Sequence, residues 1–209
     1  MEDLAANNRI GILGGTFNPV HMGHLILAQD AMEHFELGRI LFMPCSRPPH
    51  KPDRDLLPAE HRIAMLEAAI EGDLRFQVSR METDRDGISF TIDTARELHR
   101  LHPAAEITFI LGADSLLELH LWKDVHELLA LCRFVTFTRP GAEYASLQEA
   151  DLHLPASSQE RLKSCIRIGH TADISSTDIR YRVAEGLAIR YLVHPAVEMY
   201  IAEHSLYRR

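Results

Sequence analysis

Residues 10–25 read IGILGGTFNPVHMGHL and decide the fold. The apolar run at 10–13 predicts a buried strand, the glycine pair at 14–15 ends it, and an amphipathic helix pattern follows from His24. A helix that starts after a glycine turn presents free backbone N–H groups and a partial positive charge, which attract phosphate. Because His21 and His24 can donate hydrogen bonds to an anion at that helix start, the stretch predicts a phosphate site.

The sequence of this loop does not match either of two common phosphate-binding motifs. A Walker loop needs Lys-Ser or Lys-Thr after its last glycine, and the glycine spacing does not fit the dinucleotide fingerprint. The pattern G-G-T-F-N-P-x-H-x-G-H resembles the signature of the HxGH nucleotidyltransferases, which have a Rossmann-like fold and join a nucleoside triphosphate to a phosphorylated acceptor with release of pyrophosphate. The triphosphate-binding residues that the resemblance implies are His21 and His24 with the turn Gly14, Gly15, Thr16 and Phe17.

The chain has 13 histidines, and we expect most of them on solvated faces. His99 and His102 form a second H-x-x-H pair that closes an amphipathic run at 91–101, just before a proline. Cations suit the C-terminal end of a helix dipole, so this pair is interpreted as structural. Neither histidine pair predicts a zinc site, because H-E-x-x-H is absent and the three cysteines are single and far apart.

Residues 174–180 read ISSTDIR. The spacing from Ser175 to Asp178 fits a capping box, so a well-capped helix is one interpretation. The hydroxyls and the guanidinium also suit a second phosphate-binding helix start. The block resembles the ISSTxIR sequence that the same nucleotidyltransferases place against the triphosphate. This implies that Arg180 clamps the β- and γ-phosphates, while the helix start of Ser175, Ser176 and Thr177 holds the triphosphate tail.

From residue 9 to residue 207 the chain resembles one subfamily closely, the bacterial nicotinate-nucleotide adenylyltransferases. The R-P-P-H-K run at 47–51 is either a proline-stiffened exposed linker or, as the resemblance implies, a loop over the acceptor mononucleotide with His50 and Lys51 near its phosphate. Residues 87–94 resemble the family's G-x-S-Y-T-x-D-T stretch, where backbone N–H groups and Thr91 receive the nicotinate carboxylate. Phe90 replaces the tyrosine, and the alternative interpretation is a simple helix start at 89–91.

Four further positions follow from the resemblance. Gly112 and Asp114 form the family's G-x-D at the nucleotide, after an apolar strand pattern. Trp122 is the only tryptophan and is implied to stack on the pyridine ring, although a lone tryptophan is usually core or interface. Arg139 of the R-P-G run is implied to reach a phosphate or to pair at the surface. Asn18 stands where many relatives have aspartate, so it is given no catalytic role.

Length and composition indicate an ordinary globular protein. The 209 residues predict one domain, 1–209, with a small C-terminal helical part at about 174–209. The hydrophobic content is 46% and the charged content 25%. A net charge of −8 argues against a general nucleic-acid binder, and no apolar stretch approaches the ~20 residues that span a bilayer. Residues 1–8 lack the order of a signal peptide, and three cysteines suit a reducing cytosol, so a cytoplasmic location is expected.

The coarse pattern predicts an α/β fold, a parallel sheet with helices on both faces. Strands are expected at 10–13, 40–43, 74–78, 107–111 and 134–138, and helices at 24–37, 58–71, 91–101, 114–131 and 195–204. Gly38 and Gly72 are expected to end two of these helices. The polar segment 144–158 is expected to be an exposed connection.

The resemblance implies adenylyl transfer from ATP, with Mg²⁺ on the triphosphate, to nicotinate mononucleotide. The alternatives left open are another acceptor, such as nicotinamide mononucleotide, and a non-catalytic nucleotide sensor. The partners expected are these small molecules, with no nucleic acid and no membrane. The sequence leaves a homo-oligomer open.

Overall fold

The computed structural model describes residues 8–46, 56–85, 87, 89–138, 141–170 and 172–208. Its centre is a six-stranded parallel sheet of order β3-β2-β1-β4-β5-β6. The strands are β1 (Arg9–Gly15), β2 (Arg39–Pro44), β3 (Phe76–Val78), β4 (Glu106–Gly112), β5 (Arg133–Thr138) and β6 (Ile166–Ile168). The five expected strands and the α/β class are confirmed. The direction of winding reverses between β1 and β4, and open sheets of this kind bind ligands beyond the carboxyl ends of the strands at that point.

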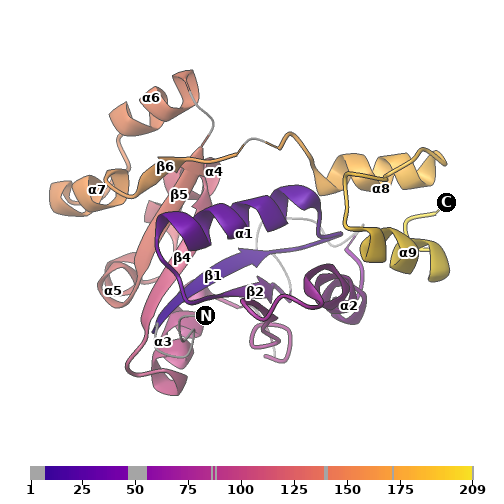
Figure 1. Cartoon of the computed structure of the whole chain (residues 1–209). Coiled ribbons are helices and arrows are strands. Elements are labelled where there is room, and N and C mark those ends of the chain that lie inside the picture. The colour runs from indigo at the N-terminus through magenta and orange to yellow at the C-terminus, as the bar shows by residue number, and fades with distance from the viewer. Residues whose placement is uncertain are drawn as a thin grey trace.

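Helices cover both faces of the sheet (Figure 1). They are α1 (Met22–His34), α2 (Ala59–Ile70), α3 (Thr91–Leu101), α4 (Ala113–Leu117), the 3₁₀ helix η2 (Leu119–Leu121), α5 (Val125–Leu131), α6 (Ala142–Glu149), α7 (Ala156–Lys163), α8 (Ser176–Ala184) and α9 (Pro195–Glu203). Buried side chains of α1, α2, α8 and α9 share one core with the sheet, and those of α3, α4, α5, α6 and α7 share the other. Both helical layers predicted from the sequence are therefore present.

The central strand β1 packs closely against its neighbours. Its Ile10 and Ile12 side chains enter one core and Leu13 the other, as alternation along a strand requires. At Gly11 a Cβ atom would lie 2.5 Å from Ile40 Cδ1, so a larger residue there would push the ends of neighbouring side chains aside. The strand then ends in two glycines, and its partner β4 ends in Gly112. The switch point of the sheet is thus edged by backbone without side chains.

The helix expected at 114–131 is interrupted. It is divided into α4, η2 and α5, and Asp124, the N-cap residue immediately before α5, has a left-handed φ of 50°. Aspartate is among the few residues that adopt this conformation readily, because its short polar side chain can bond locally. The apolar pattern continued through the break and hid it. The break places Trp122 and Lys123 in a short connection rather than on a helix.

The prediction that 144–158 is an exposed connection is wrong. The segment contains most of α6 and the start of α7, and Leu147, Leu152 and Leu154 are buried. Gln159 holds the intervening backbone, since its side chain accepts from the Leu152 N–H at 3.1 Å and donates to the Leu154 carbonyl at 2.9 Å. Two-turn helices that each bury one leucine show no apolar stripe, which is why periodicity missed them.

Two predicted helix ends have different outcomes. Gly72 follows α2 with a φ of 87°, as expected for a left-handed residue after a helix. After α1, however, the left-handed residue is Glu36 with a φ of 51°, and the Leu37 N–H bonds the Met32 carbonyl at 3.0 Å. Gly38 instead donates its N–H to the Arg9 carbonyl at 2.8 Å beside the sheet, so the prediction for Gly38 is wrong.

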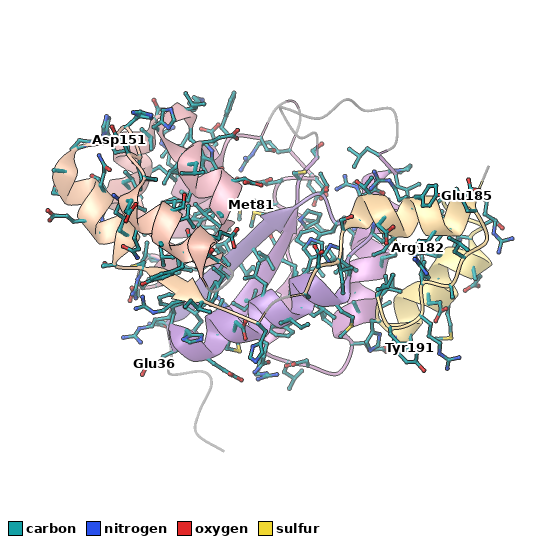
Figure 2. The ribbon with its side chains drawn as sticks, turned by 90° about the horizontal axis from the view of Figure 1, so that it is seen from above. Glu36, Met81, Asp151, Arg182, Glu185 and Tyr191 are labelled. Carbon is teal, nitrogen blue, oxygen red and sulfur yellow. The ribbon has the colours of Figure 1, made fainter. Side chains whose placement is uncertain are left out.

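The C-terminal helical part lies beside α2, at the opposite end of the sheet from α6 and α7 (Figure 1). Ile179, Val197 and Ile201 pack into the same core as α1 and α2. Figure 2 shows Arg182, Glu185 and Tyr191 at this end and Asp151 at the other. None of the helices in the described ranges is both long and apolar enough to cross a membrane.

Candidate functional site

The segment after β1, called here the histidine loop (residues 14–24), turns sharply before α1. Phe17 has a left-handed φ of 48°, and its side chain is 1% exposed. A Cβ atom at Gly15 would lie 3.1 Å from the Phe17 ring, so the glycine lets the ring fold back under the loop. Only the backbone at residue 17 is therefore available to line a triphosphate path. Beside Gly14 there is open space, because a Cβ atom there would meet nothing within 4 Å.

His21 and His24 lie together at the start of α1. Their ring centroids are 3.7 Å apart with an interplanar angle of 28°. The His21 N–H donates to His24 Nδ1 at 3.2 Å, so the proton of a neutral His24 is on Nε2. His21 Nδ1 is buried without a hydrogen-bond partner. The pair thus offers an N–H donor at the start of α1.

Burial keeps both imidazoles neutral in the free protein. It lowers the pKa of His21 from 6.5 to about 4. Burial, and then the neighbouring His21, lower the pKa of His24 well below its ordinary value. An anion beside the pair would favour their charged forms. Before a ligand binds, the histidines therefore act as hydrogen-bond donors rather than as fixed charges.

Gly23 explains the spacing of the pair. A Cβ atom at residue 23 would lie 3.1 Å from His21 Nδ1 and 3.7 Å from the Ala172 Cβ. The absence of a side chain lets the His21 ring lie close against the helix start, whereas the distance to Ala172 is that of an ordinary van der Waals contact. The glycine between the histidines thus serves their stacking.

Three backbone carbonyls of the histidine loop accept hydrogen bonds from side chains of distant segments. Arg62 Nη1 donates to the Thr16 carbonyl at 2.8 Å. Arg180 Nη1 donates to the Asn18 carbonyl at 2.9 Å, and Ser176 Oγ donates to the Pro19 carbonyl at 2.8 Å. The loop is therefore fixed through its main chain from α2 and from α8.

Arg62 was missed by the sequence reasoning. It is 1% exposed, and besides Thr16 it donates to the carbonyls of Cys45 at 2.8 Å and Leu57 at 3.0 Å. It thus joins the histidine loop to the end of β2 and the start of α2. A signal was present, because residue 62 belongs to the same helical stripe as the buried Met65, Leu66 and Ala69. An arginine on an apolar stripe is a buried charge that needs partners.

The 174–180 block lies against the same loop. Ser175 caps α8, since its Oγ accepts from the Asp178 N–H at 3.1 Å, which confirms the capped helix. Arg180 Nη2 donates to Thr177 Oγ1 at 3.4 Å, and Ser175 and Thr177 are exposed. The phosphate contacts implied for Ser175, Ser176, Thr177 and Arg180 remain predictions. Their placement beside the histidine loop is what such contacts require.

Gly112 and Asp114 lie at the carboxyl end of β4, next to the end of β1 across the switch point. Both are exposed, and a Cβ atom at Gly112 would meet nothing within 4 Å. This edge of the sheet is thus open in the same way as the edge at Gly14. The role of both residues at a nucleotide stays a prediction.

Phe90, Thr91 and Trp122, called here the aromatic edge, lie around the start of α3. Thr91 is the first residue of α3 and Phe90 is 37% exposed. Lys123 Nζ lies 4.5 Å from the Phe90 ring centroid, which brings the 122–123 connection beside this helix start. Trp122 is half-buried, with its ring 6.4 Å from that of Phe134 in an edge arrangement. The expected helix start is confirmed, while the contacts with an acceptor stay predictions.

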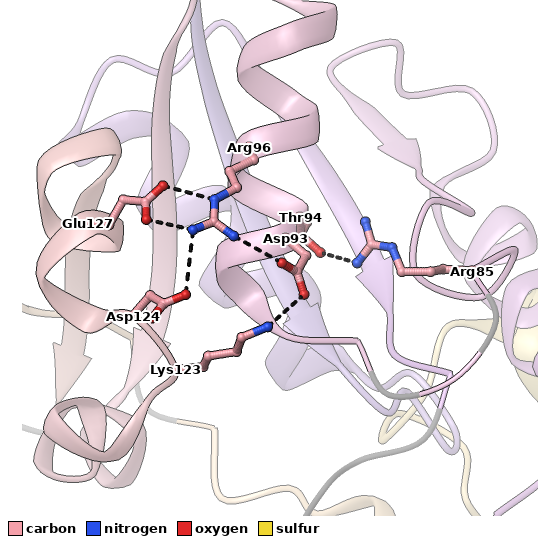
Figure 3. A network of polar contacts seen from close by, with 7 residues as sticks. All are labelled: Arg85, Asp93, Thr94, Arg96, Lys123, Asp124 and Glu127. Atoms are coloured by element: carbon pink, nitrogen blue, oxygen red, sulfur yellow. Dashed lines mark hydrogen bonds and ion pairs between the residues drawn. The ribbon is translucent and has the colours of Figure 1, made fainter.

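Ion pairs beside the aromatic edge join α3 to α5 and to the connection at 123–124, as Figure 3 shows. Arg96 of α3 bonds Glu127 of α5 at 2.6 and 2.8 Å. It also reaches Asp93 at 3.3 Å and Asp124 at 3.5 Å. Lys123 Nζ lies 3.6 Å from Asp93 Oδ2. The contacts of Arg96 with Asp124 and of Lys123 with Asp93 join α3 to the connection that carries Trp122, and sequence spacing gave no sign of these two contacts.

His50, Lys51 and Arg139 lie outside the described residues. In the part of the chain that the structure describes, no group of three or more His, Cys, Asp and Glu side chains is placed to hold a metal ion. His99 lies in the last turn of α3, and its Nε2 is 2.8 Å from the carbonyl of Leu131, the last residue of α5. Its pair with His102 lies at the end of α3, remote in sequence from the histidine loop.

Comparisons with known proteins show which family the chain is similar to. The chain matches the family described as Cytidylyltransferase-like over residues 12–182. It is 45% identical over 201 residues to a probable nicotinate-nucleotide adenylyltransferase of Moorella thermoacetica, covering 96% of this chain and 92% of that protein. A relative of the same name in Desulfitobacterium hafniense (strain DSM 10664 / DCB-2) is 40% identical over 210 residues, covering 98% of each.

A solved structure is similar in fold. Plasmodium falciparum nicotinic acid mononucleotide adenylyltransferase complexed with NaAD matches with a TM-score of 0.72 and 19% identity, covering 96% of this chain and 97% of that one. At this identity the likeness concerns the fold alone. It agrees with the parallel sheet and the Rossmann-like arrangement of helices.

Proposed function

Because the chain belongs to the cytidylyltransferase-like family and, within it, to the nicotinate-nucleotide adenylyltransferases, we propose that it transfers the adenylyl group of ATP to nicotinate mononucleotide. The products are nicotinate adenine dinucleotide and pyrophosphate, and the reaction belongs to NAD biosynthesis. The observation that carries the proposal is the meeting of two phosphate-type helix starts. Arg180 and Ser176 of one bond the carbonyls of Asn18 and Pro19, which lead directly into the other.

The chemical step needs positioning and charge stabilisation. An oxygen of the acceptor phosphate attacks the α-phosphorus of ATP, and the bond from that phosphorus to the bridging oxygen of the β-phosphate breaks. Pyrophosphate leaves with the electron pair. Since a phosphate monoester is already ionised near neutral pH, no general base is required. The protein contributes alignment and hydrogen-bond donors for the charge that develops.

The neutral imidazoles set the role of the histidines. His24 Nε2 carries a proton while its Nδ1 is occupied by the His21 N–H, so the N–H can point to a phosphate oxygen. His21 and His24 steady the α- and β-phosphates, and Arg180 stabilises the departing pyrophosphate. The turn from Gly14 to Phe17 supplies backbone N–H groups along the triphosphate.

Mg²⁺ enters as part of the co-substrate. Bound to ATP, it would be held by phosphate oxygens and water and would neutralise part of the triphosphate charge. The histidine loop and the 174–180 block offer N–H, O–H and guanidinium donors, which suit the phosphate oxygens. The cytoplasmic location, the single domain and the oligomeric state stay predictions.

We infer that the acceptor binds at the aromatic edge. Backbone N–H groups at the start of α3, with Thr91, suit a carboxylate, because a helix start attracts anions. Trp122 offers an aromatic face to the pyridine ring. The replacement of tyrosine by Phe90 leaves backbone donors unchanged, so the carboxylate contact does not depend on a phenol.

The test is pyrophosphate release from ATP and Mg²⁺ with nicotinate mononucleotide, run beside nicotinamide mononucleotide. We expect turnover with a strong preference for the acid. Equal use of both acceptors would keep the adenylyl transfer and remove the carboxylate role of the aromatic edge. Binding of ATP without turnover on either acceptor would favour another acceptor or the nucleotide sensor.

A further inference from the structure

The C-terminal end of the described chain reaches back to the histidine loop through a single side chain. The Tyr207 hydroxyl donates to Asn18 Oδ1 at 2.8 Å. Asn18 is 4% exposed, and the same oxygen accepts from the Leu57 N–H at 3.4 Å. The side chain of Asn18 therefore collects bonds from the chain end and from the segment before α2.

Asn18 is also held through its backbone. Its carbonyl accepts from Arg180 Nη1 at 2.9 Å, and the next carbonyl, of Pro19, accepts from Ser176 Oγ at 2.8 Å. Tyr207 thus fixes the side chain of Asn18, and the backbone carbonyl of the same residue accepts a hydrogen bond from Arg180. His21 follows only three residues later. A shift of Asn18 would move the proposed pyrophosphate clamp and the histidine pair relative to each other.

The surroundings of the Tyr207 hydroxyl keep it protonated, so that it can act as a hydrogen-bond donor. Burial raises the pKa of Tyr207, while the nearby positive charges of Arg180 and Arg62 act in the opposite direction. The hydroxyl therefore lies close to both guanidinium groups that hold the histidine loop, and it stays protonated at neutral pH.

We propose that Tyr207 is a positioning residue for the adenylyl transfer, acting through Asn18 to fix the histidine loop against Arg180. This inference rests on the proposed function and adds a residue to it. It also explains why residue 18 needs an acceptor oxygen but no charge: the Tyr207 hydroxyl and the Leu57 N–H both donate to it. Both of these bonds need only an acceptor oxygen, which an amide and a carboxylate each provide.

The test compares Tyr207→Phe with Tyr200→Phe. Tyr200 also lies near the chain end, and its hydroxyl is 3.0 Å from His61 Nδ1 of α2, so the control loses a comparable bond without touching the histidine loop. We expect Tyr207→Phe to raise the Kd for MgATP, measured by calorimetry without any acceptor, by roughly three- to tenfold, the range for one hydrogen bond of ordinary net strength. kcat/KM for ATP should fall by the same factor, with KM for the acceptor unchanged. Tyr200→Phe should lower Tm without these changes.

The route through Asn18 is tested by a double-mutant cycle. In an Asn18→Ala background the added Tyr207→Phe change should matter by about twofold or less, since the shared partner is gone. In an Asn18→Asp background, which keeps an acceptor oxygen, Tyr207→Phe should again weaken MgATP binding by the full factor. This second background keeps the test possible even if Asn18→Ala fails to fold. Equal MgATP affinity in Tyr207→Phe and Tyr200→Phe would overturn the inference. Because MgATP binding needs no acceptor, a lack of turnover with nicotinate mononucleotide would overturn only the proposed function.

Discussion

The histidine loop is held by hydrogen bonds to its backbone carbonyls from buried or half-buried side chains, whereas the aromatic edge is held by ion pairs between side chains at the surface. Arg62, Arg180 and Ser176 bond main-chain oxygens of the loop. Around the aromatic edge, the side chains of Arg96, Asp93 and Lys123 are each exposed by a third or more. Main-chain anchors in a dry environment define position tightly, while exposed ion pairs are weak and screened by salt. The triphosphate side is therefore the rigid half of the proposed site.

The largest expected effect comes from removing a donor of the rigid half. His24→Ala should lower kcat by about 10²–10³-fold, the usual loss for one preorganised donor to developing charge. His99→Ala is the matched control, because His99 has a hydrogen-bonded ring at the end of α3 and no place in the proposed site. Both variants should keep the wild-type circular dichroism. Near-normal turnover of His24→Ala would remove the histidine pair from the chemistry.

The same substitution in both halves tests how they are held. Arg62→Met should destabilise the protein by about 3 kcal/mol or more, because the half-buried carbonyls of Thr16, Cys45 and Leu57 all lose their charged partner. Arg96→Met breaks an exposed network and should cost far less. Urea unfolding of the two variants and the wild type measures both. Equal losses would mean that burial does not separate the halves.

What could be predicted from the sequence follows the same division. The strand, the glycine turn and the paired histidines were found because each is a local pattern of adjacent residues. Tyr207 and Asn18 are 189 positions apart and meet only in the fold, and Arg96 contacts Glu127 at a separation of 31. No periodicity reports such partners. Arg62 alone left a local trace, as a charge on an apolar stripe.

Helix breaks show the same limit. Both ends of α3 were predicted correctly, because its amphipathic stripe is strong and a proline follows soon after its last residue. The break at Lys123 and Asp124 was missed since the apolar residues on either side continue the helical pattern. That break decides the placement of Trp122, so the least predictable backbone lies within the aromatic edge. The roles at His50, Lys51 and Arg139 fall outside the described residues.

The pH dependence of stability should report the buried histidine pair. The folded pKa of His21 is about 4 against 6.5 for a free imidazole, so the unfolded state binds the proton first as the pH falls. Stability should then fall from pH 6.5 toward 4, by about 1.4 kcal/mol per pH unit for each histidine that stays neutral in the folded state. Urea unfolding at pH 7, 6 and 5 should give a shallower fall for His21→Asn than for the wild type. If the two stability curves ran parallel, His21 would take up its proton at the same pH in the folded and the unfolded protein, and its burial would not lower its pKa.

His170 provides a contrast of opposite sign. Its Nδ1 lies 2.6 Å from Oδ1 of the buried Asp30, and this partner raises its pKa. The stabilisation from this pair is complete below the unfolded pKa of 6.5 and is lost as the pH rises through the higher folded value. In His170→Asn the loss of stability relative to wild type should therefore be greater at pH 6 than at pH 9. The reverse order would contradict the Asp30 contact.

The smallest expected effect is in the exposed half. Lys123 contacts the Phe90 ring and Asp93, so Lys123→Met should loosen the connection beside Trp122. Exposed ion pairs are weak, and we expect KM for nicotinate mononucleotide to rise by roughly two- to fivefold while KM for ATP is unchanged. Arg100→Met is the control: it breaks the exposed Arg100–Glu97 pair within α3 and should leave both KM values unchanged. The difference between Lys123→Met and wild type should shrink in 0.5 M salt, about the concentration at which screening reaches only a few ångströms. A change in KM for ATP instead would mean that the two halves of the site move together.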